Sequence, residues 1–201
     1  FVPVSIFYCP EYMESTDLPE VVVGVELFEV SANLYDRIAY RGSTEGVIAL
    51  MRMKPLLPER ITLSDNPLVI VVESIEKPGN LGAIFRTADA CGADCVMVCD
   101  PLADVFNPNV IRASIGACFS VKCICCTSEE AFRWLKIHNV SILITQLQDA
   151  SLYYDTDMRG AVAIVFGRED TGLSDFWKER SNAKIRIPMA GICDSLNVSV
   201  S

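Results

Sequence analysis

The sequence predicts an α/β fold in which a parallel β-sheet is covered by helices on both faces. From residue 67 onward, short apolar runs of strand length alternate with longer segments of helical periodicity, which is the pattern of a parallel sheet. Hydrophobic residues make up 51% of the 201 residues, so the chain can bury a sizeable core. Turns rich in Gly, Asn, Ser or Pro follow some of the apolar runs, and α/β folds build their sites on such turns.

The chain divides into three predicted segments. Residues 1–55 form a small α/β domain, residues 56–66 a proline-containing linker and residues 67–201 the main domain. The first residue, Phe1, is not an initiator Met and no charged leader follows it, so we expect the small domain to lack its beginning. No apolar run approaches the roughly 18 residues that span a bilayer, so we expect no membrane partner.

In the small domain, apolar runs at residues 2–8, 21–30 and 47–53 are separated by polar stretches, and a helix is expected over residues 33–40. The main domain is more regular. Residues 68–72 are a continuous apolar run, which indicates a strand buried on both faces. Residues 80–91 have helical spacing and end at Gly92, a helix stop.

The remaining elements of the main domain follow the same alternation. Further strands are expected at residues 95–99, 121–125, 141–145, 161–166 and 184–187. Further helices are expected at residues 109–118, 128–136 and 174–181, with one more beginning near Ser195. Ser128 and Ser174 are the predicted start signals of their helices.

The nine cysteines lie mostly inside apolar stretches, where they act as small core residues. Cys123 and Cys126 form a Cys-x-x-Cys pair, but no second pair and no histidine follows at ligand spacing, so we expect no metal. The single histidine, His138, ends an amphipathic segment and is predicted to lie on the surface. An odd number of free thiols favours the reducing cytoplasm.

The formal net charge of −9 argues against a generic binder of polyanions, which is normally basic. Residues 1–30 contain acidic side chains but no Lys or Arg, whereas Arg37, Arg41, Arg52 and Lys54 follow closely. An RNA partner would therefore have to contact a local basic face. The alternative is that these charges only solvate the surface.

Three blocks of small and polar residues, 77–90, 166–173 and 187–201, each follow a predicted strand. The first block does not match the Gly-x-Gly-x-x-Gly turn of nucleotide-binding domains. Together and in this order, the blocks resemble the three motifs of the SpoU/TrmH family of RNA ribose methyltransferases, in the knotted SPOUT superfamily. The third block, Ile-Pro-Met-x-Gly followed by Ser-Leu-Asn, carries most of the resemblance, which covers residues 67–201.

This resemblance implies 2′-O-methylation of a ribose in RNA with S-adenosylmethionine, by a homodimer whose catalytic domain ends in a trefoil knot. It implies ribosomal RNA as the substrate, with transfer RNA as the alternative. Residues 1–55 resemble the L30e-like substrate-binding domain that precedes many catalytic domains of the family. The family continues past the position of Ser201 with a helix that completes the knot and much of the dimer interface, so we expect that helix to be cut short here.

The resemblance assigns catalytic roles to Asn80, Arg86, Glu169, Ser195 and Asn197. Methyl transfer needs the donor in line with the 2′-oxygen, loss of the hydroxyl proton and a clamp on the neighbouring phosphates. A guanidinium group keeps its proton, so we expect Arg86 to orient phosphate and hydroxyl rather than to act as a base. The plainer alternatives are that Asn80 caps a helix and that Arg86 pairs with a neighbouring acid. For Ser195 and Asn197 the alternative is that they are only N-cap and first-turn residues of a helix.

The donor is assigned by the same resemblance to Gly167, Ile187, Leu196 and Thr145. Main-chain N–H and C=O groups make the polar contacts there, so the apolar Ile187 and Leu196 suit the task. The alternative for Gly167 is an ordinary glycine-rich turn.

Predicted RNA contacts form a larger set. They are Arg37, Arg41, Arg52 and Lys54 in the small domain, and Arg112 and Ser114 in the main domain.

Two other classes of protein stay open. One is a non-catalytic RNA-binding or ribosome-associated module on the same fold, and the other is a nucleotide-dependent oxidoreductase. The combination of Arg86, Glu169, Ser195 and Asn197 favours the enzyme, because a binding module does not need all four.

Overall fold

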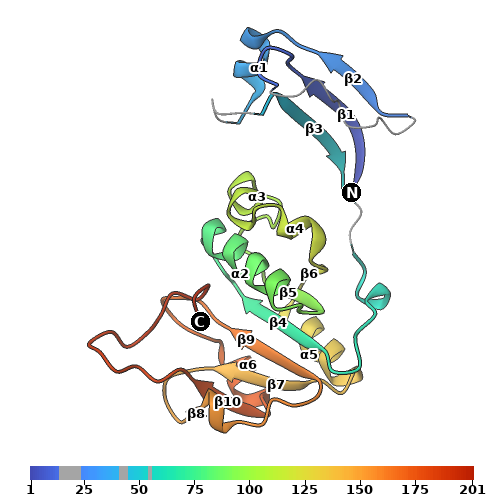
Figure 1. Cartoon of the computed structure of the whole chain (residues 1–201). Coiled ribbons are helices and arrows are strands. Elements are labelled where there is room, and N and C mark those ends of the chain that lie inside the picture. The colour runs from blue at the N-terminus through green and yellow to red at the C-terminus, as the bar shows by residue number, and fades with distance from the viewer. Residues whose placement is uncertain (14–23, 41–44, 54–55) are drawn as a thin grey trace. The chain divides into compact units, whose positions relative to one another are not determined.

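The computed structural model describes residues 1–13, 24–40, 45–53 and 56–201. The chain divides into two compact units, Phe1–Pro55 and Leu56–Ser201, which are labelled by element in Figure 1. Within the described ranges, none of the helices has the length and apolar character that a bilayer crossing requires.

The first unit is a three-stranded sheet with one helix. Its elements are β1 (Val2–Tyr8), β2 (Glu26–Glu29), α1 (Ala32–Ile38) and β3 (Val47–Arg52). The strand order is β2-β1-β3, with β1 parallel to β2 and antiparallel to β3. Cys9, Val30 and Tyr35 form its buried core. The apolar run expected at residues 21–30 contributes a shorter strand, whose four residues are all exposed. The L30e-like, RNA-binding nature of this unit stays a prediction.

The second unit is built on a seven-stranded sheet in which every described pairing is parallel, as the sequence predicts. Its strands are β4 (Leu68–Glu73), β5 (Cys95–Cys99), β6 (Cys123–Cys126), β7 (Ser141–Thr145), β8 (Ser151–Leu152), β9 (Val162–Phe166) and β10 (Ala183–Arg186). Their order is β6-β5-β4-β9-β7-β10-β8. The trefoil knot stays a prediction.

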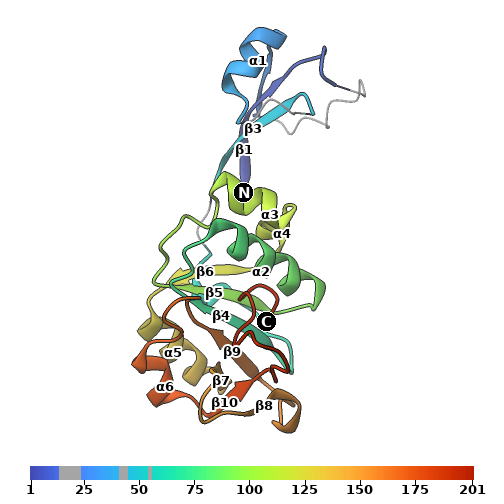
Figure 2. The ribbon, with the colours of Figure 1, turned by 90° about the vertical axis from the view of Figure 1, so that its left-hand side faces the viewer.

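Helices cover both faces of this sheet (Figure 2). One face carries α2 (Pro78–Ala90), α3 (Pro108–Ser114) and α4 (Ala117–Ser120), and the other carries α5 (Ser128–Ile137) and α6 (Asp175–Arg180). Two 3₁₀ turns, η1 (Pro58–Arg60) and η2 (Tyr153–Asp155), complete the elements. Because both faces are covered, β4 and β5 are largely buried, which explains why β5 and residues 68–72 of β4 are continuously apolar.

The single helix expected over residues 109–118 is wrong, because two residues interrupt it. Ile115 and Gly116 have φ angles of 52° and 83°, in the left-handed region. The Ile115 N–H then bonds to the Arg112 carbonyl at 3.1 Å, and the Gly116 N–H to the Ile111 carbonyl at 3.3 Å. This is how a helix ends at a glycine, so α3 stops at Ser114 and α4 starts afresh.

Two helix starts also differ from expectation. Thr127, rather than Ser128, caps α5: its hydroxyl accepts from the Glu130 N–H while the Glu130 carboxylate accepts from the Thr127 N–H, which is a capping box. No helix begins near Ser195 in the part of the chain that the structure describes. Instead a single turn begins at Asn197, whose side-chain oxygen accepts from the Ser199 N–H at 2.9 Å and whose carbonyl accepts from the Val200 N–H at 2.9 Å.

Candidate active site

The candidate site lies where the order of the strands changes direction. β4 leads through α2 to β5 on one side, whereas its parallel neighbour β9 leads through α6 to β10 on the other side. The loops that follow the two strands, residues 74–77 and 167–173, therefore diverge. Open α/β sheets bind ligands at such a point, outside the carboxyl ends of the strands.

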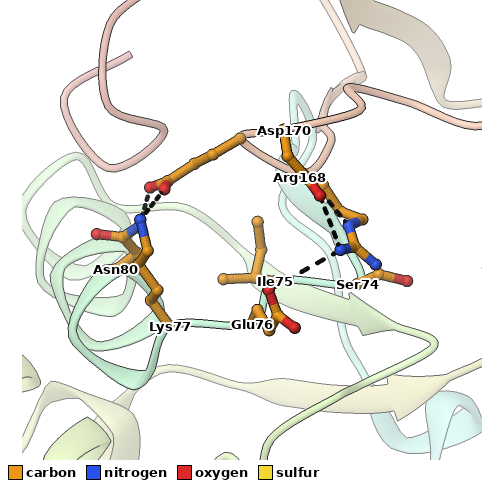
Figure 3. A pocket seen from close by; sticks show the side chains of 8 residues that line it. Ser74, Ile75, Glu76, Lys77, Asn80, Arg168 and Asp170 are labelled. Atoms are coloured by element: carbon orange, nitrogen blue, oxygen red, sulfur yellow. Dashed lines mark hydrogen bonds and ion pairs between the residues drawn. The ribbon is translucent and has the colours of Figure 1, made fainter.

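A pocket of about 140 Å³ occupies this position (Figure 3). It is lined by Ser74, Ile75, Glu76, Lys77, Asn80, Arg168, Glu169 and Asp170. Lys77 and Asn80 come from the start of α2, and Arg168 and Asp170 from the loop after β9. The first and second sequence blocks thus form opposite walls of one pocket.

Glu169 joins the three sequence blocks by hydrogen bonds. Its Oε1 accepts from Asn80 Nδ2 and, at 3.2 Å, from Asn197 Nδ2. Asn197 Nδ2 also lies 3.1 Å from Asn80 Oδ1, so the two amides contact each other. Three of the five predicted catalytic residues therefore meet at one carboxylate, although up to 117 positions separate them in the sequence. Their chemical roles stay predictions.

Sequence reasoning missed Lys77, which completes this cluster. Its Nζ forms an ion pair with Glu169 Oε2, and this hydrogen bond and the charge of Glu169 raise the pKa of Lys77. Lys77 occupies the N-cap position of α2, where the helix dipole disfavours a cation. That mismatch was the available signal, because a lysine at a helix N-terminus needs a partner elsewhere.

Arg168 and Asp170 form a two-pronged ion pair on the opposite wall. Arg168 Nε and Nη2 donate to the two carboxylate oxygens of Asp170, each at 3.0 Å. The bond from Arg168 lowers the pKa of Asp170 to about 2. Glu76 lies 3.8 Å from Arg168 and connects the two walls. The pair fixes the loop beside Glu169 while leaving the Glu169 carboxylate to the amides and Lys77.

Gly167 is required by the loop's own backbone. A Cβ at this position would meet the backbone of Gly172 at 2.3 Å and that of Leu173 at 2.4 Å. The close approach arises because Arg168 and Gly172 exchange two backbone hydrogen bonds, at 3.1 and 3.0 Å. The loop is therefore a tight turn, which was the plainer alternative, and the predicted donor contact of Gly167 is a further role that stays a prediction.

Three of the four predicted donor-binding residues lie at the carboxyl ends of three neighbouring strands. Thr145 ends β7, Gly167 follows β9 and Ile187 follows β10, and these strands are adjacent in the order β9-β7-β10. The Thr145 hydroxyl donates to the Val165 carbonyl at 3.0 Å. Leu196 is 43% exposed on the segment that leads to Asn197.

Arg86 is absent from this pocket and lines a second hollow on α2, α3 and α4, with Asp89, Ser120 and residues 114–117. Its side chain is exposed, and it makes no hydrogen bond or ion pair with any residue that the structure describes. The alternative that it pairs with a neighbouring acid is therefore not what the structure has. Ser195 is also outside the cluster, since its hydroxyl bonds to Asp194 at 3.1 Å, and Ser199 binds Asn197 instead.

The predicted RNA contacts are distributed unevenly. Arg37 at the end of α1, Arg52 at the end of β3 and Arg112 on α3 are exposed. Ser114 is 1% exposed and its hydroxyl donates to the Ile111 carbonyl at 2.8 Å, so it supports α3 from within. Arg41 and Lys54 lie outside the described residues.

The cysteines do not gather into a ligand set. Cys123 packs on the α2 side of the sheet and Cys126 on the α5 side, because residues three apart on a strand face opposite ways. Over residues 1–13, 24–40, 45–53 and 56–201, no group of three or more metal-binding side chains is found. His138 ends α5, exposed, with Nδ1 at 2.8 Å from the Trp134 carbonyl.

Comparisons with known proteins point to one family. The model of the SpoU rRNA Methylase family matches residues 67–201. The 23S rRNA (guanosine(2553)-2′-O)-methyltransferase RlmP of Bacillus subtilis is 26% identical over 189 residues, which cover 94% of this chain and 74% of the relative. The 23S rRNA (guanosine-2′-O-)-methyltransferase RlmB of Salmonella typhi is 34% identical over 165 residues, which cover 78% and 67%.

The fold gives the same result. The crystal structure of the AdoMet-bound rRNA methyltransferase from Sinorhizobium meliloti superposes with a TM-score of 0.88 at 26% identity, over 98% of this chain and 76% of that one. The family match also includes all three sequence blocks, whose Asn80, Glu169 and Asn197 meet in the pocket. This chain therefore belongs to the SpoU rRNA methylase family.

Proposed function

We propose that this chain is an S-adenosylmethionine-dependent enzyme that methylates the 2′-oxygen of a ribose in ribosomal RNA. The observation that carries the proposal is the meeting of Asn80, Glu169 and Asn197 at the switch point of the sheet. The relatives named as 23S rRNA guanosine 2′-O-methyltransferases support ribosomal RNA, and a guanosine within it, as the substrate.

The carboxyl ends of β7, β9 and β10 suit the donor. Thr145, Gly167 and Ile187 lie at three adjacent strand ends, where turns present main-chain groups, and the half-buried Ile187 adds an apolar surface. We infer that these residues and Leu196 would hold S-adenosylmethionine. When bound, this cofactor supplies a methyl group on a positively charged sulfur, which the ribose oxygen attacks as the carbon–sulfur bond breaks.

The chain's own residues then have separate tasks. The two amides and Lys77 hold the Glu169 carboxylate in one orientation, and this fixed group shapes the wall against which the ribose is placed. Arg86 binds the neighbouring phosphate and directs the 2′-hydroxyl, whose proton leaves for solvent as the new oxygen–carbon bond forms.

The separation of Arg86 from the Glu169 cluster supports a homodimer. Within one chain the Glu169 pocket lies at the start of α2, whereas Arg86 lines a separate hollow farther along the same helix. An RNA held at one chain's Glu169 pocket can be clamped by Arg86 of a second copy, so the complete site would form between two copies. We also propose that this dimer is located in the cytoplasm.

The test is methyl transfer from radiolabelled S-adenosylmethionine to protein-free ribosomal RNA. We expect label at a ribose 2′-oxygen, which protects the adjacent phosphodiester from alkaline cleavage. Label on transfer RNA but not on ribosomal RNA would show that transfer RNA is the substrate instead. RNA binding without transfer to either RNA would favour the non-catalytic module and overturn the proposal.

A further inference from the structure

Glu73 is a buried carboxylate that the predicted mechanism does not use. It is the last residue of β4 and is 7% exposed. Burial of a carboxylate is costly unless hydrogen bonds replace its water. In this molecule the replacement comes from a distant segment, because Ser174 donates its N–H to Oε2 at 2.8 Å and its hydroxyl to Oε1 at 2.6 Å.

Ser174 is the N-cap of α6, but its own side chain makes no capping bond to that helix. Its hydroxyl is turned to Glu73 instead, 101 positions earlier in the sequence. The contact therefore serves the junction between two loops rather than the start of the helix. One loop follows β4 and leads to Lys77 and Asn80 at the start of α2, and the other precedes Ser174 and carries Glu169.

The loop that carries Glu169 is consequently fixed at both ends. Its first end is held by strand pairing, since Phe166 lies opposite Val72 in the β4–β9 ladder. Its second end is held by Glu73 through Ser174, and Leu173 beside it is 3% exposed in the core. The side chain of Glu169 projects from the short turn between these two anchors.

A second layer of hydrogen bonds holds Glu73 itself. The Ser128 hydroxyl lies 3.3 Å from Glu73 Oε1 and 2.6 Å from Asp100 Oδ2, and Trp177 Nε1 donates to it at 3.2 Å. Ser128 opens α5 and Trp177 lies in α6, so both helices on that face of the sheet are tied to the end of β4. A buried and satisfied network of this kind rigidifies its surroundings, which makes it suited to placing a neighbouring group.

We propose that Glu73 is a positioning residue for methyl transfer: it holds the Glu169 loop against the start of α2, so that Glu169 meets Asn80 and Asn197. This inference rests on the proposed function for its activity readout. Its structural part, that Glu73 keeps residues 168–172 in a fixed conformation, can be measured without any enzymatic activity.

The molecule offers a matched control at the amino ends of the strands, opposite the carboxyl ends that form the site. Asp94, just before β5, also grips one serine by two bonds, from the Ser64 N–H at 2.7 Å and the Ser64 hydroxyl at 3.1 Å, and it accepts from the Leu68 N–H at 3.1 Å. Asp94→Asn therefore removes a contact of the same chemistry, far from the pocket loops. Because Asp94 is half-buried whereas Glu73 is buried, urea unfolding of both variants measures how far their stabilities differ.

The experiment compares Glu73→Gln with Asp94→Asn. We expect Glu73→Gln to lower the single-turnover methyl transfer rate about tenfold or more at saturating donor, because misplacement of a site group by about 1 Å costs this much. Affinity for S-adenosylhomocysteine should change less than about threefold, since strand pairing still holds the end of β9. Asp94→Asn should transfer methyl at the wild-type rate.

Two readouts separate positioning from general destabilisation. In a Glu169→Gln background, Glu73→Gln should cause no further loss of rate, because its effect passes through Glu169. Amide hydrogen exchange at residues 168–172 should rise in Glu73→Gln but not in Asp94→Asn. If Glu73→Gln does not fold, Ser174→Ala tests the same contact more mildly.

The outcomes distinguish this proposal from the proposed function. Equal losses of rate in Glu73→Gln and Asp94→Asn, or unchanged exchange at residues 168–172, would overturn the positioning role. A wild-type protein without transferase activity, but with exchange that rises in Glu73→Gln, would overturn the proposed function and leave the loop anchor in place.

Discussion

Among the predicted catalytic residues, Arg86 is the one whose side chain no described residue holds. We expect Arg86→Ala to abolish methyl transfer while S-adenosylhomocysteine still binds, because none of the predicted donor residues lies on α2. Arg86→Lys should fail as well, since a point charge lacks the planar two-donor fork that clamps a phosphate. Calorimetry and a transfer assay measure the two effects.

Arg133 provides the control for Arg86. It is exposed on α5, on the opposite face of the sheet, so Arg133→Ala removes the same charge without touching the predicted site. Its transfer rate should equal that of the wild type. Near-normal turnover of Arg86→Lys would show that positive charge alone is sufficient and that the geometric role is wrong.

The ion pair between Arg168 and Asp170 has a pH signature. Because the bonds from Arg168 lower the pKa of Asp170 to about 2, from an ordinary value of 3.8, the contribution of this pair is present above about pH 4. It is lost as the pH falls through about 2, when the carboxyl is protonated in the folded state. In Arg168→Leu, NMR titration should show the pKa of Asp170 raised toward 3.8, because the largest of its lowering contacts is lost. An unchanged, low pKa would contradict the assignment to Arg168.

For single residues, the sequence predicted which residues belong to the site better than it predicted the residues that they contact. Asn80, Glu169 and Asn197 stand in recognisable blocks, and all three occur in the cluster. Lys77 was missed because the helix was expected to begin at residue 80 rather than directly after Lys77, so its unfavourable place at a helix N-terminus was not recognised. Glu73 was missed because an acid at the end of a strand has many ordinary explanations. Their significance depends on contacts 92 and 101 positions away, which no local pattern encodes.

At the scale of elements, α2 and α3 pack through a glycine. A Cβ at Gly82 would meet the Ala113 Cβ at 2.5 Å and the Val110 carbonyl at 2.7 Å. Gly82→Ala should therefore force the helices apart and destabilise the protein by about 1–3 kcal/mol, as overpacking of a core does. Urea unfolding measures the change. Adding Ala113→Gly should recover part of the lost stability by removing the contact with the Ala113 Cβ. The recovery should be incomplete because the contact with the Val110 carbonyl remains.

Gly79 on the same helix is the control for this prediction. A Cβ there meets nothing within 4 Å, so Gly79→Ala should leave the stability unchanged or raise it by up to about 1 kcal/mol. If Gly82→Ala proved as stable as Gly79→Ala, the helices would be less closely packed than the structure has them.

Strands were predicted more accurately than helix ends for a physical reason. A strand buried on both faces, such as β5 or residues 68–72 of β4, is apolar along its length, and that requirement is visible residue by residue. The break at Ile115 depends on two backbone angles in the left-handed region, and a β-branched residue gives no warning of such an angle. β8 has two residues, too few for any periodicity to appear.

At the scale of the whole molecule, charge separates the expected tasks of the two units. The chain carries −9 overall, so attraction to RNA must come from local groups rather than from a general field. Arg37 and Arg52 are the described, exposed members of the basic set predicted for the first unit. The predicted donor residues all belong to the second unit. RNA affinity and donor affinity should therefore respond to different substitutions.

This separation predicts a change in salt dependence. Removing one cation that neutralises a phosphate lowers the slope of log affinity against log salt by about 0.7–0.9, so Arg37→Gln with Arg52→Gln should lower it by about 1.5. Affinity for S-adenosylhomocysteine should not change. Arg133→Gln with Lys136→Gln removes the same charge from α5 and should leave the slope as it is, because that helix carries no predicted RNA contact. Equal slopes for the two double variants would reduce the first unit to a structural role and would place the phosphate contacts on the second.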